Sequence, residues 1–233
     1  MARVALPRGD EKRAWVEEMF DRVAPSYERV NRVISLGQDR KWRRDVVRAL
    51  ALPPASVVLD VACGTGDLCR ELGNAKHRPV GVDLSAGMLA TARGCGPLVR
   101  GDALAMAVRD GAVDGVVCGF ALRNLVALEP FFAECARVLR AGGRFVAVDA
   151  SVPANAFARA GHDLWFRRIV PWIGGRLSGE VDAYRYLPAS TAYLPDGDEL
   201  VSRLRDAGFE SVARTTRMAG AVQLLSGTRR PGS

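Results

Sequence analysis

A short β-branched run that ends in a glycine-rich turn constrains this chain more than any other feature. Residues 57–62 read Val-Val-Leu-Asp-Val-Ala, follow two prolines, and lead into Cys-Gly-Thr-Gly at residues 63–66. Apolar, β-branched runs bounded by Pro and Gly are typical of strands that are buried on both faces of a sheet. Because a helical pattern follows at residues 67–72, the segment predicts the first half of a strand–helix–strand unit.

Strand-like and helical patterns alternate through the rest of the chain. Strands are expected at residues 79–83, 98–100, 113–118 and 144–149, and helices at residues 86–93, where Ser85 can cap the start, and 128–140. A further helix at 198–207 and two strands, at 211–216 and 221–225, complete the pattern. Strands separated by helices indicate a parallel sheet. We therefore expect an α/β fold with a Rossmann-like sheet that is mostly parallel and has an antiparallel last strand.

Two segments lie outside this alternation. Residues 1–50 read as a helical cap, in which an apolar stripe at helical spacing stops at Pro25 and a second helix begins near Asp39. Residues 154–190 are richer in aromatic residues and are expected to form a helical insertion on the substrate side. We expect one domain over residues 1–233, with the cap and the insertion packed over the top of the sheet.

Composition excludes several classes of protein. The 233-residue chain has a net charge of +7, yet only three of its 33 basic residues are lysine, so the excess looks like a compositional bias towards arginine. Because no apolar run reaches the ~18–20 residues of a membrane-spanning helix and no secretion signal is visible, we expect a cytoplasmic protein. Five cysteines without a Cys-x-x-Cys pair indicate small buried side chains in a reducing compartment. His77 and His162 are too few for a His-rich metal site, so no metal is expected.

The charges around the glycine-rich turn discriminate between ligands. A dinucleotide fingerprint has a third glycine where this chain has Cys69. Asp60 ends the preceding strand and Asp67 opens the following helix, and two carboxylates oppose a pyrophosphate. S-adenosylmethionine instead presents a cationic amino group and a sulfonium, and Gly64 and Gly66 let the backbone approach such a ligand closely. The turn therefore predicts a site for S-adenosylmethionine.

Two further acids follow later strands. Asp83 ends the second strand about 20 residues after Gly64, the position of an acid that accepts hydrogen bonds from both ribose hydroxyls. Asp102 follows the third strand, where it can accept a hydrogen bond from the adenine amino group. Because ligands bind at the carboxyl edge of such sheets, we expect these acids to surround one cofactor.

The turn after the fourth strand carries a family resemblance. It reads Gly-Phe-Ala-Leu-Arg-Asn at residues 119–124, and with it the chain resembles the ubiquinone/menaquinone biosynthesis C-methyltransferases over nearly its full length. The other matching segments are Phe-Asp-Arg-Val-Ala-Pro-Ser-Tyr-Glu-Arg-Val-Asn at 20–31, Ser-Leu-Gly-Gln-Asp-Arg-Lys-Trp-Arg-Arg at 35–44, Gly-Val-Asp-Leu-Ser-Ala-Gly-Met-Leu at 81–89 and Tyr-Arg-Tyr-Leu-Pro-Ala-Ser at 184–190. Many methyltransferases share the glycine-rich turn, whereas the Leu-Arg-Asn turn and the Tyr-x-Tyr-Leu-x-x-Ser stretch are far more specific.

The resemblance implies a class I, S-adenosylmethionine-dependent methyltransferase and a set of site residues. The implied reaction is methylation of a ring carbon on a polyprenylated quinol, such as demethylmenaquinol or its ubiquinol-pathway equivalent. Tyr27, Arg123 and Asn124 are expected beside the substrate as catalytic residues. The expected cofactor-binding residues are Asp60, Gly64, Thr65, Gly66, Asp83, Leu84, Asp102, Ala103 and Gly119.

These residue types suit ring-carbon methylation. A sulfonium is already an activated electrophile, so the protein mainly aligns the carbon with the methyl group and excludes water. Arg123 keeps its charge near neutral pH, and we expect it to stabilise a developing phenolate. Asn124 is expected to orient the hydroxyl and Tyr27 to close the site. The structural alternatives are a salt bridge at the sheet for Arg123 and plain packing for Tyr27.

Departures from the family pattern leave other acceptors open. The family usually has Ser where this chain has Gly119, and it commonly has Asp where this chain has Ala127. It has Val-Ala-Leu-His where residues 222–225 read Val-Gln-Leu-Leu. One alternative is a C- or O-methyltransferase of an aromatic natural-product scaffold, and another is a non-catalytic subunit that binds S-adenosylmethionine. Nucleic acid is not an expected partner, because the turn at 119–122 lacks the Asp/Asn-Pro-Pro-aromatic motif of amino-methylating enzymes.

The expected partners follow from the acceptor. A polyprenylated quinol is a lipid, so peripheral contact with the inner membrane face is expected, where basic N-terminal helices can meet anionic headgroups. A homodimer is left open.

Overall fold

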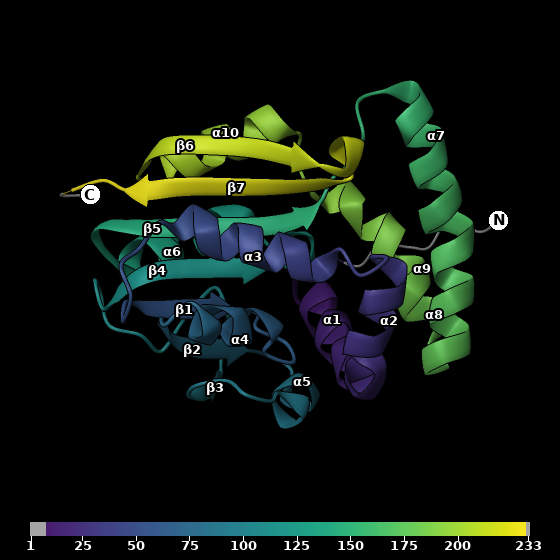
Figure 1. The fold of residues 1–233 in the computed structure, drawn as a ribbon, viewed down its shortest axis with the longest axis horizontal. Coiled ribbons are helices and arrows are strands. Elements are labelled where there is room, and N and C mark those ends of the chain that lie inside the picture. Colours follow the sequence, from purple (N-terminus) through teal and green to yellow (C-terminus); the bar gives the residue numbers. More distant parts are fainter. Residues whose placement is uncertain (1–7, 232–233) are drawn as a thin grey trace.

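A seven-stranded sheet forms the centre of the structure, a computed structural model that describes residues 8–231 (Figure 1). The strands are β1 (Val57–Val61), β2 (Arg78–Asp83), β3 (Leu98–Arg100), β4 (Val113–Gly119), β5 (Leu139–Ala150), β6 (Phe209–Arg217) and β7 (Val222–Arg229). Their order is β3-β2-β1-β4-β5-β7-β6. Neighbours from β3 to β5 pair in parallel, whereas β7 is antiparallel to both β5 and β6. The expected α/β class, with a mostly parallel sheet and an antiparallel last strand, is confirmed.

The strand order places a crevice at one edge of this sheet. After β1 the chain adds β2 and β3 on one side, and then crosses to β4 on the other. Open α/β sheets bind ligands outside the carboxyl ends of the strands at such a switch point, because successive connections diverge there. The carboxyl ends of β1, β2 and β4 therefore define where a site is built.

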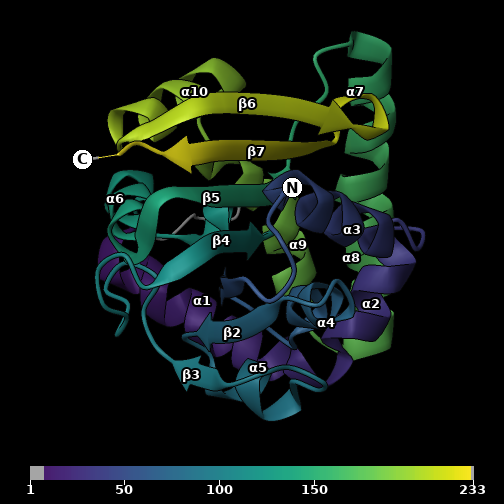
Figure 2. The same cartoon turned by 60° about the vertical axis from the view of Figure 1, so that its left-hand side comes forward.

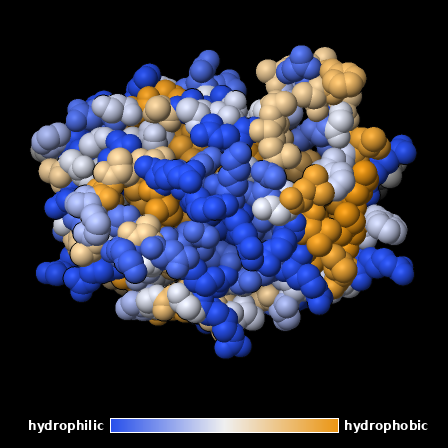
Figure 3. Space-filling model, viewed as in Figure 1, coloured by the Kyte–Doolittle hydropathy of each residue, from blue (hydrophilic) through white to orange (hydrophobic). Residues whose placement is uncertain are grey.

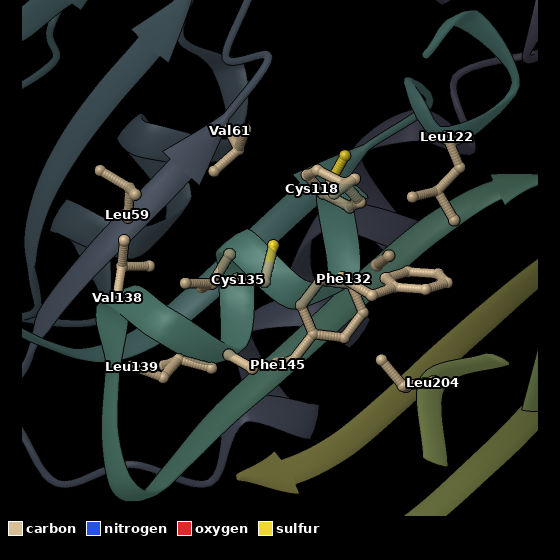
Figure 4. Packing of buried hydrophobic residues seen from close by; sticks show 14 of the residues in the cluster. Leu59, Val61, Cys118, Leu122, Phe132, Cys135, Val138, Leu139, Phe145 and Leu204 are labelled. Carbon is tan, nitrogen blue, oxygen red and sulfur yellow. The ribbon is translucent and has the colours of Figure 1, made fainter. Parts of the chain in front are cut away.

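Helices cover both faces of the sheet (Figure 2). On one face lie α6 (Leu128–Val138) and α10 (Gly197–Asp206), and on the other lie α3 (Asp39–Leu50) and α4 (Asp67–Asn74). Phe132 of α6 packs on Phe145 of β5 in the core, with the ring centroids 5.8 Å apart (Figure 4). Burying a phenylalanine contributes about 1.5–3 kcal/mol, so this aromatic core holds the sheet as a rigid platform for the site.

Several element boundaries differ from those expected. The short helix α5 (Ala86–Thr91) ends before residue 93, and α6 ends at Val138 rather than residue 140. Strand β5 starts at residue 139, earlier than expected, because Leu139 pairs with Val113 before a register shift in the ladder. Strands β6 and β7 are also longer than expected, because each continues its ladder beyond the apolar pattern.

The N-terminal cap contains one helix more than expected. After α1 (Gly9–Val23), a 3₁₀ turn η1 (Ala24–Ser26) carries Pro25, and α2 (Tyr27–Ile34) follows it directly. The proline occupies the first turn, where its missing N–H costs nothing, so it redirects the chain without ending helical structure. Asp21 ties α1 to the start of α5, because its Oδ1 accepts hydrogen bonds from Ser85 Oγ (2.5 Å) and from the N–H of Gly87 (2.8 Å).

The insertion is helical, as expected, and packs against the cap. It consists of α7 (Ala156–Leu164), a π-helical turn η3 (Trp165–Ile169), α8 (Val170–Ser178), α9 (Val181–Ser190) and a 3₁₀ turn η4 (Thr191–Tyr193). Two further 3₁₀ turns, η2 (Leu122–Asn124) and η5 (Met218–Gly220), lie outside the insertion. Met19, Val30, Tyr184 and Tyr186 are buried in one apolar cluster between cap and insertion. The cap and the insertion together form a cover at the carboxyl edge of the sheet. Among residues 8–231, none of the helices is both long enough and apolar enough to cross a membrane.

Candidate active site

The turn after β1 holds its backbone in the left-handed region at three positions. Ala62, Gly64 and Gly66 have φ angles of 56°, 55° and 82°. At Gly66, the N-cap of α4, a Cβ atom would lie 1.9 Å from Cys95 Sγ. Glycine is therefore required there for both φ and space, and the turn is held close over the end of β1.

Asp60 lies beneath this turn without a complete set of partners. Its side chain is buried, and its Oδ2 atom has no hydrogen-bond partner among the described residues. Burial raises the pKa of Asp60 to about 7, a hydrogen bond with Cys69 lowers it, and the Asp83 carboxylate raises it. An unpaired buried carboxylate oxygen is costly, so the site is built to receive a cationic or hydrogen-bond-donating group.

Asp83 joins the turn to the end of β2. Its Oδ2 accepts a hydrogen bond from the N–H of Gly64 (2.7 Å), and its Oδ1 accepts one from the N–H of Ser85 (2.9 Å). Burial raises the pKa of Asp83 above its ordinary value, while these backbone hydrogen bonds lower it. Each carboxylate oxygen can accept a second hydrogen bond, so both remain able to bind a ligand.

Asp102 follows β3 and contacts the cap. Its Oδ1 accepts a hydrogen bond from the N–H of Leu104 (2.9 Å), and its Oδ2 pairs with Nη2 of Arg13 on α1 (3.1 Å). Arg13 was not predicted as a site residue, because the pairing depends on how α1 crosses the sheet. The pair places the cap over the third strand.

Two cavities meet at the carboxyl edge of the sheet. The first, with about 850 Å³ of empty space, lies over β2 and β3 and is lined by Gly64, Asp83, Leu84, Asp102, Ala103 and Gly119 among the predicted cofactor residues. The second, with about 1440 Å³, lies between the turn and the insertion and is lined by Asp60, Gly64, Thr65 and Gly119 among them. Phe20, Tyr27, Ala62, Gly64, Gly119 and Phe120 line both cavities. Gly66 lines neither cavity.

Asp67 does not present the free carboxylate that the sequence suggested. It lines the second cavity, but Oδ2 lies 2.6 Å from Arg43 Nη2, and Oδ1 pairs with Arg70 Nη2. Two arginines neutralise this acid, so the preference of the turn for a cation rests on Asp60. Arg70 lies three residues further along α4, whereas Arg43 belongs to α3 and is distant in the sequence.

Arg123 is buried in an ion pair. Its Nη1 pairs with Asp149 on β5 and donates to the carbonyl of Phe120 (2.8 Å), and its Nε donates to Ser190 Oγ (3.2 Å). Nη2 has no hydrogen-bond partner among the described residues, and Arg123 lines the second cavity. The salt bridge that was weighed as the structural alternative is therefore present, and one nitrogen of the guanidinium remains available to a ligand.

Asn124 lies on the other side of the same 3₁₀ turn. It lines the first cavity, and its buried Oδ1 has no hydrogen-bond partner among the described residues. Its Nδ2 donates to the carbonyl of Phe120 at 3.4 Å. Phe120 itself has a φ of 59°, a strained conformation for a residue with a side chain. Arg123 and Asn124 thus point to different cavities from one strained turn.

Tyr27 lies where the two cavities meet. It lines both of them, and its ring packs edge-on against Phe20 with the centroids 6.0 Å apart. Burial raises the pKa of Tyr27, a hydrogen bond with Asn31 lowers it, and the charge of Arg123 also lowers it. The phenol is therefore a neutral hydrogen-bonding group at physiological pH.

Several site residues were not predicted from the sequence. Lys12 is buried, and its Nζ donates to the carbonyls of Arg123 (2.9 Å) and Leu125 (2.6 Å), which anchors α1 to the catalytic turn. Burial lowers the pKa of Lys12 to about 8. Trp165 and Phe166 line the second cavity, and the aromatic richness of the insertion was the signal for them. Among residues 8–231, no cluster of His, Cys, Asp and Glu could hold a metal ion.

The sheet has the architecture of the class I methyltransferase fold, and two cavities lie at its carboxyl edge. Among solved structures, the fold is similar to the putative methyltransferase in a complex with the Haloferax volcanii Trm112 activator, with a TM-score of 0.66 at 17% identity over 91% of this chain and 98% of that one. A second similar structure is a Thermotoga maritima S-adenosylmethionine-dependent methyltransferase, with a TM-score of 0.65 at 18% identity over 92% of this chain and 100% of that one. At these identities the likeness shows the fold alone.

The sequence comparison identifies the family. The model of the ubiE/COQ5 methyltransferase family matches residues 8–229, and the chain belongs to that family. A demethylmenaquinone methyltransferase of Roseiflexus castenholzii is 37% identical over 97% of this chain and 98% of the relative. One of Mycolicibacterium vanbaalenii is 40% identical over 92% and 94%. A ubiquinone/menaquinone biosynthesis C-methyltransferase of Syntrophotalea carbinolica is 36% identical over 91% and 92%. The enzyme is an S-adenosylmethionine-dependent methyltransferase, as the resemblance implied.

Proposed function

We propose that this enzyme transfers the methyl group of S-adenosylmethionine to a ring carbon of a quinol of the demethylmenaquinol type. The observation that carries the proposal is the junction of the two cavities at Tyr27 and Gly119. One cavity is lined by acids at the ends of β2 and β3, and the other by the aromatic side chains of the insertion. The names of the full-length relatives support this acceptor.

The first cavity suits the adenosine part of the cofactor. Asp83 keeps acceptor capacity beyond the backbone N–H groups of Gly64, Ser85 and Leu84, so it would accept a hydrogen bond from the ribose. Asp102 would accept the adenine amino group, because Oδ1 and Oδ2 each keep a lone pair beyond the bonds to Leu104 and Arg13. Leu84 and Ala103 line the same space and would flank the base.

The turn after β1 suits the amino-acid end of the cofactor. Asp60 Oδ2 is the orphaned acceptor, and a cationic α-amino group would satisfy it and favour its ionised form. Thr65 is also buried and lines the second cavity, as Asp60 does. We therefore assign Asp60 to the ammonium and Thr65 to the neighbouring polar atoms, with Gly64 and Gly119 allowing close approach.

The bound cofactor supplies an electrophilic methyl group, and the residues of this chain supply alignment, exclusion of water and charge. Tyr27, at the junction of the cavities, would close the path between cofactor and acceptor. Arg123 Nη2 would donate to the quinol oxygen as the hydroxyl loses its proton, because a fixed cation stabilises a developing phenolate. Asp149 and Ser190 hold the guanidinium in place for this contact. Asn124, which lines the first cavity, would orient a polar group of the bound ligand.

The departures from the family pattern fall mostly outside the acceptor cavity. Ala127 is the N-cap of α6 and makes no capping hydrogen bond, so the family's Asp would act there as a helix cap. Leu225, where the family has His, is buried in the core under α6 and α10. Gly119 lines both cavities, and a Cβ there would have ordinary contact with Leu68 at 3.6 Å. Of the three positions, Gly119 alone bears on the choice of acceptor.

A product-mass measurement tests the proposal. Purified enzyme, S-adenosylmethionine and reduced short-chain demethylmenaquinone should give a product that has gained one methyl group. Arg123→Ala should lower kcat with little effect on the affinity for S-adenosylhomocysteine, and Asp83→Ala should weaken that affinity. Binding of S-adenosylhomocysteine without any mass gain would contradict the quinol acceptor and favour an aromatic natural product or a non-catalytic subunit.

A further inference from the structure

An exposed apolar surface borders the second cavity. The described residues Val33, Leu36, Phe157, Leu164 and Trp172 form what we call the apolar face. Leu36, Leu164 and Trp172 have exposed fractions of 64%, 55% and 68%, and Phe157 reaches 90%. These values are far above those of core side chains, and large exposed apolar patches mark interaction sites.

The apolar face comes from two parts of the chain. Val33 and Leu36 lie at the end of α2, whereas the other three lie along α7 and α8. The indole Nε1 of Trp165 donates to the carbonyl of Ile34 (3.2 Å), which fixes the insertion against α2. Figure 3 shows apolar atoms gathered over α8 and the end of α2, beside hydrophilic atoms over α3.

Unpaired arginines border the apolar face. On α2 and α3, the exposed side chains of Arg32, Arg40, Lys41 and Arg44, which we call the basic fringe, form no ion pair among the described residues. The two acids of α3 are neutralised within the protein, Asp39 by Arg43 and Asp45 by Arg48 and Arg217. The fringe therefore presents net positive charge to whatever contacts the apolar face.

The helical insertion has the composition of an interfacial helix. Residues 156–178 contain one acid, Asp163, and four arginines, together with two tryptophans. A helix with apolar and aromatic residues on one side and arginines beside them lies in the plane of a lipid surface, with its apolar side in the acyl boundary and its cations at the headgroups.

We propose that the apolar face and the basic fringe dock the enzyme on a bilayer that contains anionic phospholipid, with the mouth of the second cavity against the membrane. The same helices build both surfaces, since Leu36, Trp165 and Phe166 line the second cavity. A lipid-borne acceptor then passes from the acyl layer into the cavity without crossing water. This inference rests on the proposed quinol acceptor, but the binding of this surface to lipid can be measured without the methyl transfer.

Vesicle sedimentation tests the docking surface. The wild-type enzyme is expected to partition to vesicles of phosphatidylglycerol and phosphatidylcholine, and less to phosphatidylcholine alone. Leu164→Ser/Trp172→Ser should weaken partition by at least about tenfold, because two exposed apolar side chains no longer enter the acyl region. Arg40→Gln/Arg44→Gln should weaken it about fivefold or more on anionic vesicles at low salt, and much less on neutral ones.

Matched controls separate this surface from general effects. Val99→Ser and Arg109→Gln change an exposed valine on β3 and an exposed arginine before β4, so vesicle partition should stay at the wild-type level. The Leu164→Ser/Trp172→Ser variant should methylate a tailless demethylmenaquinol analogue at the wild-type rate and lose rate on vesicle-embedded substrate.

Three outcomes would overturn the docking surface. They are equal partition of the wild-type enzyme and Leu164→Ser/Trp172→Ser, equal binding to neutral and anionic vesicles, and a dimer in solution that this double variant dissociates. The last outcome would assign the face to a second copy of the chain. Failure to methylate the tailless analogue, with vesicle binding intact, would instead contradict the proposed acceptor.

Discussion

Asp60→Asn is expected to stabilise the empty protein at high pH and to weaken cofactor binding. The pKa of Asp60 is raised from 3.8 to about 7, chiefly by burial. A shift of about 3 units corresponds to roughly 4 kcal/mol of preference for the neutral form in the folded state. Because the folded pKa lies above the unfolded one, this stability is fully present below pH ~4 and is lost as the pH rises through ~7.

The asparagine variant should escape that loss. At pH 5 the two proteins should unfold at nearly the same temperature, because ionisation of Asp60 in the unfolded state has by then removed only roughly 1–2 kcal/mol, which the cost of the imperfectly bonded amide offsets. At pH 8 the variant should be more stable by ~1–3 kcal/mol, since an imperfectly bonded amide cancels ~1–3 kcal/mol of the gain. For a chain of this size, that is roughly 2–4 °C in Tm per kcal/mol. Affinity for S-adenosylhomocysteine should fall ~10–100-fold, because a charge-assisted hydrogen bond to the ammonium is lost.

Thermal unfolding between pH 5 and 8, with calorimetric titration of S-adenosylhomocysteine, measures both effects. Asp206→Asn, an exposed position on α10, serves as the control and should change neither. A Tm difference between Asp60→Asn and wild type that is the same at pH 5 and pH 8 would refute the role of burial. Unchanged affinity for S-adenosylhomocysteine would refute the contact with the ammonium.

Three further substitutions probe the frame of the site. Asp149→Ala should destabilise the protein by about 3–5 kcal/mol in urea denaturation, because it leaves the buried guanidinium of Arg123 without a counter-ion; a cost below ~1 kcal/mol would show that the pair is solvated. Ala127→Asp should add about 1 kcal/mol by capping α6 and raise Tm by roughly 2–4 °C, and an unchanged Tm would argue against the cap. Gly66→Ala should cost at least ~1–3 kcal/mol, because the left-handed backbone and Cys95 both oppose a Cβ; wild-type stability would mean that the turn tolerates side chains.

The strands and the acids at their ends could be predicted from the sequence. Runs such as residues 57–62 combine β-branched side chains with Pro and Gly boundaries, a combination that is typical of β-strands. Asp83 and Asp102 follow such runs directly, and parallel strands bring their carboxyl ends to one edge. The predicted parallel strands alone therefore put Asp83 and Asp102 at the same edge of the sheet.

The partners of charged side chains could not be predicted. Asp67 pairs with Arg43 on α3, and Lys12 on α1 donates to the carbonyl of Arg123, which is 111 residues away in sequence. Such contacts depend on how the cap crosses the sheet, and local patterns carry no information on that. The helix α2 was missed for a local reason, because Pro25 was interpreted as an end of helical structure and instead begins a 3₁₀ turn.

The position of the transferred methyl group tests the central claim most directly. The enzyme would be incubated with S-adenosylmethionine that carries a deuterated methyl group and with reduced demethylmenaquinone, and the product analysed by mass spectrometry and carbon NMR. The junction of the two cavities at Tyr27 and Gly119 predicts a deuterated methyl group on a ring carbon. A deuterated methyl group on a hydroxyl oxygen, or no transfer by an enzyme that binds S-adenosylhomocysteine, would contradict the claim.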